Sequence, residues 1–332
     1  MVQVTTPTAP VADSFFIVKA CSKKISSKGD AYLDLVFADA RGEIPAKLWD
    51  YKETVHDWIA AGMIVKVRGN EERWNDKKQY RIQRIRRVGP EDRVDLHQLV
   101  PCAPYEGADM FSRLLDIIDA FTDPDLKALT ARMVADRRER ILTCPAAVRL
   151  HHAVCGGLLY HTLSILHLAE GVCRVYPFVR RDLLYSGAIL HDLAKIDELV
   201  VDETGIASGY SARGELLGHL VMGAIALDHA ADELGTPEET RTLLQHMLIS
   251  HHGTPEFGAA VRPMVLEAEL LSMLDNMDAT VNQITNAIQT VEPGGFSAKL
   301  WSLDQRKFYR PIAGDNPAEK FHAELPERES DS

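Results

Sequence analysis

Hydrophobic and polar residues follow one another in short runs over residues 11–95, a pattern typical of half-buried β-strands. The runs FFIVKACSKKIS, AYLDLVFADA, GEIPAKLWD and MIVKVRGNEERWNDKKQYRIQRIRRV are rich in β-formers, and SSKGD, DARG and NDKK supply turns. Between the third and fourth strands, YKETVHDWIAAG instead predicts a short helix that ends at Gly62. Five short strands with one interposed helix predict a small β-barrel of the OB-fold type.

After residue 107 the apolar residues are spaced three and four apart, which indicates amphipathic helices. Residues 96–107, LHQLVPCAPYEG, contain two prolines and a glycine and are predicted to be a linker. We expect an all-α helical bundle over residues 108–310, a flexible N-terminus at 1–10 and a disordered tail at 311–332. Helices are expected in MFSRLLDIIDAF, PDLKALTARMVADRRERILTC, GGLLYHTLSILHLAEGVCRVY, RDLLYSGAILHDLAKIDEL, RGELLGHLVMGAIALDHAADELG, TPEETRTLLQHMLISHHG and MVLEAELLSMLDNMDATVNQITNAIQTV.

The composition is that of an ordinary globular chain, with 46% hydrophobic and 26% charged residues over 332 positions. There is no run of 18 apolar residues and no signal-peptide pattern, so we expect no membrane association. The five cysteines are odd in number and lack CxxC spacing, which argues against disulfides and a cysteine zinc site and favours the cytoplasm. The sequence leaves the oligomeric state open, so an oligomer is compatible with it.

The net charge of −11 is unevenly distributed. Residues 1–100 hold 17 Lys and Arg against 14 Asp and Glu, whereas the remaining residues hold 20 against 34. Ordinary surface variation would account for this. So would a first domain that meets a polyanion and a second that binds cations.

Histidines and acids recur along the predicted helices at intervals of about one helix and one connection. They are His161, the doublet His191-Asp192, His219, the doublet His251-His252, and Asp275. A helical bundle can bring such side chains together in its core. Imidazoles and carboxylates without a thiolate suit divalent manganese, iron, zinc or nickel, with magnesium also possible. Six or seven ligands are too many for one tetrahedral site and suit two metals, with Asp192 as the natural bridge.

The segments HHAVCGGLLYHT, AILHDLAKIDEL, GELLGHL and ISHHGTPEFGAAVRPMVLEAELLSMLDNMDA resemble the HD superfamily of metal-dependent phosphohydrolases. Together with the OB-like front end, they resemble the YhaM-type 3′-5′ exoribonucleases over about residues 11–310. This resemblance implies an HD phosphohydrolase domain over 108–310 and a manganese-dependent enzyme that removes nucleotides from single-stranded 3′ ends.

The resemblance also implies roles for single residues. His161, His191, Asp192 and Asp275 would ligate the first metal, and His219 and His251 would hold the second together with Asp192. His252 would be a further ligand or a neighbour of one. The catalytic residues would be Asp192 and Lys195, whose ammonium would bind a phosphate oxygen; a salt bridge to Asp192 or Glu198 is the alternative.

His152, Tyr210 and Arg213 are further candidate substrate contacts, with a polar helix start for His152 and a solvated loop for the other two as the alternatives. In the barrel, aromatic rings could stack on bases and basic side chains could follow phosphates. Several of these rings must instead fill the core, and alternation does not say which. The candidates are Phe16, Tyr32, Trp49, Trp74, Tyr80, Lys47, Arg68, Arg81 and Arg84.

The expected reaction is attack of a metal-activated hydroxide on the last phosphodiester of single-stranded RNA. Single-stranded DNA stays possible, because recognition of the 2′-hydroxyl is invisible in the sequence. One alternative is an HD-type nucleotide or cyclic-nucleotide phosphohydrolase; the cyclic-dinucleotide version is weakened because TPEFG, and not a Gly-Tyr-Pro element, follows HHG. The other is a non-enzymatic single-stranded nucleic-acid-binding protein, which would not need the full ligand set.

Overall fold

The computed structural model describes residues 6–7, 11–27, 29–74, 77–148 and 152–312. The expected flexible N-terminus and disordered tail therefore fall almost entirely outside the described residues. The chain divides into two compact units: the first ends at Cys102 and also takes in Asp202–Thr204, and the second holds Ala103–Val201 and the residues from Gly205 on. No helix in the described ranges has the length and apolar character that crossing a membrane requires.

The first unit is a closed five-strand barrel. Strand β2 pairs antiparallel with β3 and β5, β3 pairs with β4, β4 pairs parallel with β6, and β5 pairs with β6 to close the barrel. This connectivity confirms the predicted OB fold. The expected helix between the third and fourth strands shortens to α1 (Glu53–His56). The strands are β1 (Thr6–Pro7, on β5), β2 (Ala12–Ile25), β3 (Ala31–Asp39), β4 (Gly42–Leu48), β5 (Ile64–Trp74) and β6 (Lys77–Arg87).

Aromatic rings fill the barrel core. Phe16 stacks on Phe37 with ring centroids 5.0 Å apart, and the Tyr80 ring meets Phe16 edge-on at the same separation. The exposed fractions of Phe16 and Tyr80 are 2% and 5%. Neither ring can stack on a base, so their assignment as nucleic-acid contacts is wrong. The rings share this core with aliphatic side chains such as Leu35 and Val65, and their burial stabilises a small barrel.

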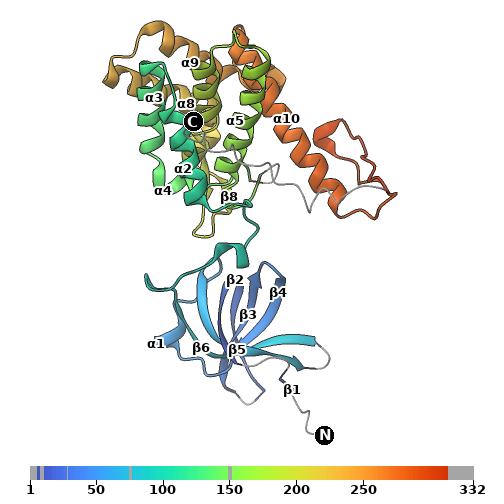
Figure 1. Ribbon diagram of the computed structural model, residues 1–332. Helices are drawn as coiled ribbons and strands as arrows, with labels where there is room; N and C mark the ends of the chain where they lie inside the picture. The colour runs from blue at the N-terminus through green and yellow to red at the C-terminus, as the bar shows by residue number, and fades with distance from the viewer. Residues whose placement is uncertain (1–5, 8–10, 28, 75–76, 149–151, 313–332) are drawn as a thin grey trace, which may run out of the picture. The chain divides into compact units, whose positions relative to one another are not determined.

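The second unit is a helical bundle (Figure 1). The expected helices are interrupted by a hairpin of β7 (Leu199–Val201) and β8 (Ala207–Tyr210) and by a break between α3 and α4. The α-helices are α2 (Gly107–Asp119), α3 (Pro124–Ala135), α4 (Arg138–Ile141), α5 (Gly157–Val175), α6 (Arg181–Leu190), α7 (Lys195–Glu198), α8 (Ala212–Leu234), α9 (Glu238–Ser250) and α10 (Leu266–Gln289). Single 3-10 turns lie at Leu96–Gln98, Pro255–Phe257 and Trp301–Leu303.

The HD doublet lies at a helix end and not inside a helix. Helix α6 stops at Leu190, His191 is its C-cap, and tight turns connect it to the four-residue α7. The backbone N–H of Lys195 donates to the Asp192 carbonyl at 2.9 Å in one of these turns. The expectation of one continuous helix through Leu199 is therefore wrong, although the apolar side chains of this stretch are buried.

Candidate metal centre

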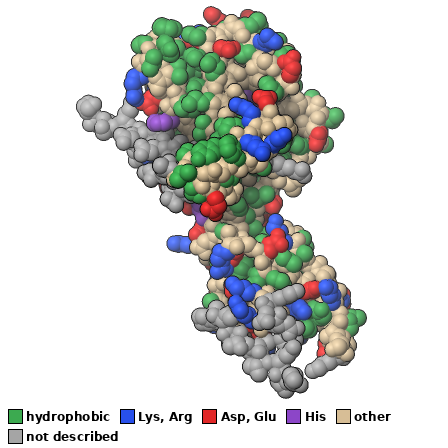
Figure 2. Space-filling model, turned by 90° about the vertical axis from the view of Figure 1, so that its right-hand side faces the viewer, with side chains coloured by type: hydrophobic (Ala, Val, Ile, Leu, Met, Phe, Trp, Pro, Cys, Tyr) green, Lys and Arg blue, Asp and Glu red, His purple; other side chains and the backbone are tan. Residues whose placement is uncertain are grey.

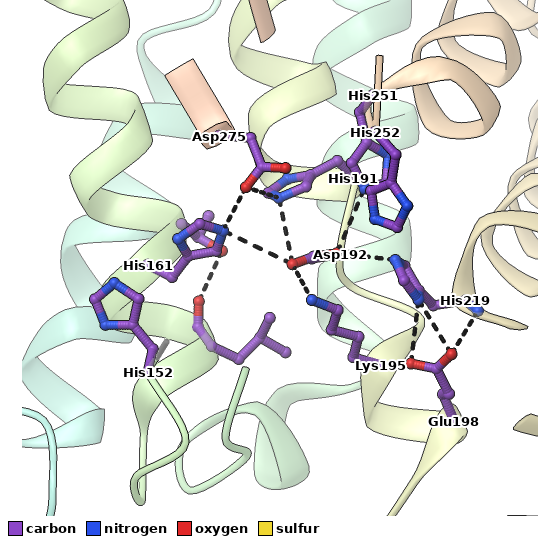
Figure 3. Close-up of polar contacts among 12 residues, drawn as sticks. His152, His161, His191, Asp192, Lys195, Glu198, His219, His251, His252 and Asp275 are labelled. Atoms are coloured by element: carbon purple, nitrogen blue, oxygen red, sulfur yellow. Dashed lines mark hydrogen bonds and ion pairs between the residues drawn. The ribbon is translucent and has the colours of Figure 1, made fainter. Parts of the chain in front are cut away.

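Five elements of the helical unit bring the predicted ligands together (Figure 3). His161 lies in the second turn of α5, His191 caps α6, His219 lies within α8, His251 caps α9, and Asp275 lies within α10. They lie in the core of the bundle, where none of the four histidine residues is more than 8% exposed. The ligands that the sequence intervals placed on separate elements thus do share one buried site.

His219 reaches the site because helix α8 is kinked one residue before it. Gly218 has φ 69° and ψ 160°, outside the helical region, so the helix restarts in a new direction at His219. A residue with a side chain is strained at this φ, whereas glycine is not. The glycine before the histidine in GELLGHL therefore allows the kink that turns His219 towards the core.

Asp192 lies at the centre of the cluster, and each of its oxygens faces a pair of histidines. Its Oδ2 is 3.4 Å from Nε2 of His191 and 3.7 Å from Nε2 of His161. Its Oδ1 is 3.2 Å from Nε2 of His219 and 3.6 Å from Nε2 of His251. Asp275 Oδ1 joins the first pair, 3.2 Å from His161 Nε2 and 4.0 Å from His191 Nε2. The carboxylate thus has the position of a bridge between two half-sites.

Several of these inward-facing atoms have no hydrogen bond. Among the described residues, Nε2 of His191, His219 and His251 and Oδ1 of Asp192 are buried and lack a hydrogen-bond partner. Leaving buried polar atoms unsatisfied is costly, and bound cations would satisfy them. Sets of three donor atoms lie within 4.8 Å of one another, including His161 with His191 and Asp192. Imidazole nitrogens and carboxylate oxygens of this kind fit a divalent metal.

The outer nitrogens of the four histidines are all fixed. Nδ1–H of His191 donates to the Ala188 carbonyl at 2.9 Å, and that of His251 donates to the Leu248 carbonyl at 2.8 Å. Nδ1 of His161 lies 2.7 Å from an Asp278 oxygen, and Nδ1 of His219 lies 3.1 Å from both oxygens of Glu198. With Nδ1 protonated, Nε2 is the nitrogen that is left to bind a metal.

Asp278 and Glu198 have roles that the sequence interpretation missed. Asp278 also accepts from Nε2 of His152 at 2.8 Å, and Glu198 also accepts from the backbone N–H of His219 at 3.0 Å. The only sequence signal for Asp278 was its position three residues after Asp275, which places both on one face of α10. Glu198 was considered only as an ion-pair partner of Lys195.

Burial and charge compete in setting the pKa values of the cluster. Burial would lower the pKa of His161, but the carboxylates of Asp275 and Asp278 outweigh it and raise that pKa to about 10. Burial dominates at His251 and lowers its pKa to about 4. Burial would raise the pKa of Asp192, but the charges of Lys195 and His191 hold it well below its usual range. The carboxylates therefore stay ionised, as metal ligands must.

Lys195 contacts Asp192 directly, with Nζ 2.6 Å from Oδ2. Burial would lower the pKa of Lys195, but Asp192 outweighs it and raises it. The ion pair considered at the sequence level is thus present, and the ammonium lies in the site.

His252 lies beside the cluster. Its Nδ1–H donates to the Phe257 carbonyl at 2.9 Å, and the centre of its ring is 4.4 Å from that of the His251 ring.

The other predicted substrate contacts differ in how exposed their side chains are. His152 is 5% exposed and lies against Asp278, so its position is behind His161 and not towards solvent. Tyr210 ends β8, and Arg213 lies in the first turn of α8. Both side chains are exposed.

Comparison with known proteins supports this site. The HD domain family model matches residues 158–280, which contain every predicted ligand as well as Glu198 and Asp278. The 3′-5′ exoribonuclease YhaM of Geobacillus sp. (strain WCH70) is 37% identical over 90% of this chain and 92% of its own length. That of Bacillus subtilis (strain 168) is 36% identical over 90% of this chain and 94% of its own length. This chain belongs to the YhaM family of 3′-5′ exoribonucleases.

Among solved structures, the second OB-fold domain of replication protein A from Methanococcus maripaludis is similar to this YhaM-family chain. The match covers 26% of this chain and 89% of that domain, at 16% identity and a TM-score of 0.20.

In the barrel of this YhaM-family chain, Tyr32 and Trp49 form an aromatic platform. Their rings stack with centroids 4.7 Å apart, and Lys47 Nζ lies 5.6 Å and 5.3 Å from the two ring centres. The exposed fraction of Trp49 is 49%. The pair therefore combines an accessible π-face with a cation, as a single-strand contact requires.

The remaining barrel candidates differ in their surroundings. Arg68 and Arg84 line a pocket of about 400 Å³. Arg68 lies 3.9 Å from Asp13, and Arg81 lies 3.9 Å from Glu72. The side chain of Trp74 lies outside the described residues.

Proposed function

We propose that this chain is a metal-dependent 3′-5′ exoribonuclease whose active site is the cluster around Asp192. The observation that carries the proposal is the placement of one histidine pair at each oxygen of Asp192. It supports two metal ions bridged by this carboxylate, with manganese the best-suited metal and Fe²⁺, Ni²⁺, Zn²⁺ and Mg²⁺ as the alternatives. His161, His191 and Asp275 would hold one ion with Asp192, and His219 and His251 would hold the other, with His252 as a further candidate ligand.

When bound, the two ions would activate a water molecule and offset charge on the phosphate. The chain's own residues would do the rest. Asp192 and Asp275 stay ionised, and the fixed Nδ1–H groups keep each Nε2 turned inward. Lys195 would turn its ammonium to a non-bridging phosphate oxygen and stabilise the charge that develops there.

The barrel would supply affinity for the single strand. Bases would stack on Tyr32 and Trp49 while Lys47, Arg68, Arg81 and Arg84 neutralise phosphates. This leaves the active site to act on the 3′ end, whichever bases the strand contains. We propose RNA as the substrate because the relatives are named exoribonucleases. Single-stranded DNA is the substrate against which RNA should be compared.

The deciding experiment follows a 5′-labelled RNA 20-mer and the matching DNA with added Mn²⁺. The wild type should give a ladder that shortens stepwise from the 3′ end, faster on RNA. Asp192→Ala should abolish the ladder, because it removes the bridge. Asp197→Ala, five residues on and facing Arg137 and Arg140, should retain it. A folded Asp192→Ala protein that degrades RNA at the wild-type rate would overturn the proposal, and hydrolysis of mononucleotides alone would favour a nucleotide phosphohydrolase.

A further inference from the structure

The segment 291–312, called here the C-terminal segment, differs in charge from the rest of its unit. It holds four basic residues, Lys299, Arg306, Lys307 and Arg310, against two acidic ones. Residues 101–290 hold 14 Lys and Arg against 26 Asp and Glu. The segment lies beyond the HD match, which ends at residue 280. A basic stretch on an acidic unit is a local attraction for a polyanion.

The C-terminal segment has a fixed backbone. Isolated β-bridges join Phe296 to Tyr309 and Leu300 to Arg306, and Ser297 N–H donates to the Phe308 carbonyl at 2.9 Å. The guanidinium of Arg310 donates to the carbonyls of Gln289 and Val291, at 3.3 Å and 2.5 Å, and so ties the segment to the end of α10. Side chains on such a frame are preorganised, which lowers the entropy cost of binding.

Aromatic rings of the segment face solvent. The exposed fractions of Trp301 and Phe296 are 70% and 62%, and that of Tyr309 is 44%. The Phe296 and Tyr309 rings are in contact, with centroids 5.1 Å apart. Figure 2 looks onto the side from which the segment projects in Figure 1, and hydrophobic and basic side chains lie next to one another there. Exposed rings among cations are what single-stranded nucleic acids bind, by stacking and charge.

The segment is also near the metal centre along α10. The Ser302 hydroxyl donates to the Gln283 side chain, and Gln283 lies eight residues after Asp275. At 1.5 Å per helical residue, that separation is about 12 Å along the helix axis. A strand whose last nucleotide occupies the metal centre would therefore bring its preceding nucleotides within reach of the C-terminal segment.

We propose that the C-terminal segment is a single-stranded RNA contact of the catalytic unit, separate from the barrel. Trp301 and the Phe296–Tyr309 pair would stack on bases next to the 3′ end, and Lys299 and Lys307 would contact phosphates. Arg310 stabilises the fold of the segment and is not one of the proposed RNA contacts. This inference rests on the proposed function, because it names where that function's substrate lies.

The test measures binding of a fluorescein-labelled RNA 12-mer by anisotropy, with EDTA present so that no RNA is degraded. Trp301→Ala should weaken binding roughly tenfold, and Trp301→Phe should restore most of the affinity because a ring face remains. Lys299→Ala/Lys307→Ala should reduce the slope of log affinity against log salt by about 1.4, for two lost phosphate contacts. Met264→Ala, which removes another exposed hydrophobic side chain of the unit, should bind as the wild type does.

A second substrate separates this inference from the proposed function. Bis(p-nitrophenyl) phosphate has one phosphodiester and no base to stack, so all variants should hydrolyse it at the wild-type rate with Mn²⁺. Unchanged RNA affinity in Trp301→Ala and the double variant, beside normal wild-type RNA degradation, overturns this inference alone. A wild type that neither binds nor shortens RNA overturns both. Light scattering on the same samples tests whether the segment is instead an interface between copies of this chain. A Trp301→Ala protein with a lower molar mass than the wild type would also overturn the RNA contact.

Discussion

At the residue scale, the four inward-facing histidines are held in two ways. His191 and His251 both end a helix, and each bonds a carbonyl three residues earlier, where helix carbonyls lack an intrahelical partner. His161 and His219 lie within helices, where no such carbonyl is available, and a carboxylate holds each instead. Each half-site around Asp192 therefore has one histidine held by the backbone and one held by a side chain.

This division makes the two half-sites separable by mutation. Glu198→Gln should weaken metal binding at the His219–His251 half-site by about 10–100-fold, because an amide replaces the charged acceptor that orients the ring. Asp278→Asn should do the same at the His161–His191 half-site. Metal titration by calorimetry, with metal content of dialysed protein, measures both effects.

A matched control is Asp182→Asn, which alters a buried carboxylate that accepts from Thr122 and Asp123 and contacts no histidine of the cluster. It should leave metal content unchanged even where it lowers stability. Equal metal loss in all three variants would mean that general destabilisation, and not ring orientation, is the cause.

The ammonium of Lys195 is predicted to act on substrate and to oppose metal binding. Lys195→Met should lower kcat by about 100-fold, since a charged donor to the phosphate is lost. It should tighten metal binding, because a positive charge 2.6 Å from Asp192 disfavours a cation there. Steady-state kinetics and metal titration on one preparation test both signs. Weaker metal binding with unchanged kcat would assign Lys195 to the support of Asp192 alone.

At the scale of elements, the position of His219 depends on the kink in α8. Gly218→Ala places a Cβ at φ 69°, which costs roughly 1–2 kcal/mol, or straightens the helix and turns His219 away. We expect lower thermal stability and loss of metal from the His219–His251 half-site.

The control is Gly171→Ala, at a helical position in α5 with open space around its Cβ, which should be neutral or stabilising. Metal content and melting temperature separate the two cases. Wild-type metal content in Gly218→Ala would show that the kink does not aim His219.

The elements also show where sequence reasoning succeeded and where it stopped. Spacing along the chain predicted that His161, His219 and Asp275 come from separate elements, because each interval exceeds one helix. The end of α6 at Leu190 was not predictable, because the apolar three-and-four spacing continues through LAKIDEL without glycine or proline. Alternation could not distinguish Phe16, inside the barrel, from Trp49, on its surface, since both flank β-formers.

At the scale of the whole molecule, the two units should respond differently to metal removal. The unsatisfied donor atoms lie in the helical unit, so bound metal stabilises that unit and not the barrel. In scanning calorimetry, EDTA should lower the temperature of one unfolding transition and leave that of the other unchanged. A shift of both transitions by the same amount would show that the units unfold together.

The contribution of the barrel to substrate affinity should increase with the length of the substrate. Trp49→Ala removes the exposed ring of the Tyr32–Trp49 platform, so affinity for an RNA 20-mer should fall by about 5–100-fold, the range for one stacked base. Hydrolysis of bis(p-nitrophenyl) phosphate should not change, because this ester has no base to stack on the platform. Ile25→Ala, at an exposed strand position of the same barrel, serves as the control and should match the wild type on both substrates. If Trp49→Ala weakened RNA binding and ester hydrolysis by the same factor, Trp49 would contribute to the stability of the protein and not to RNA binding.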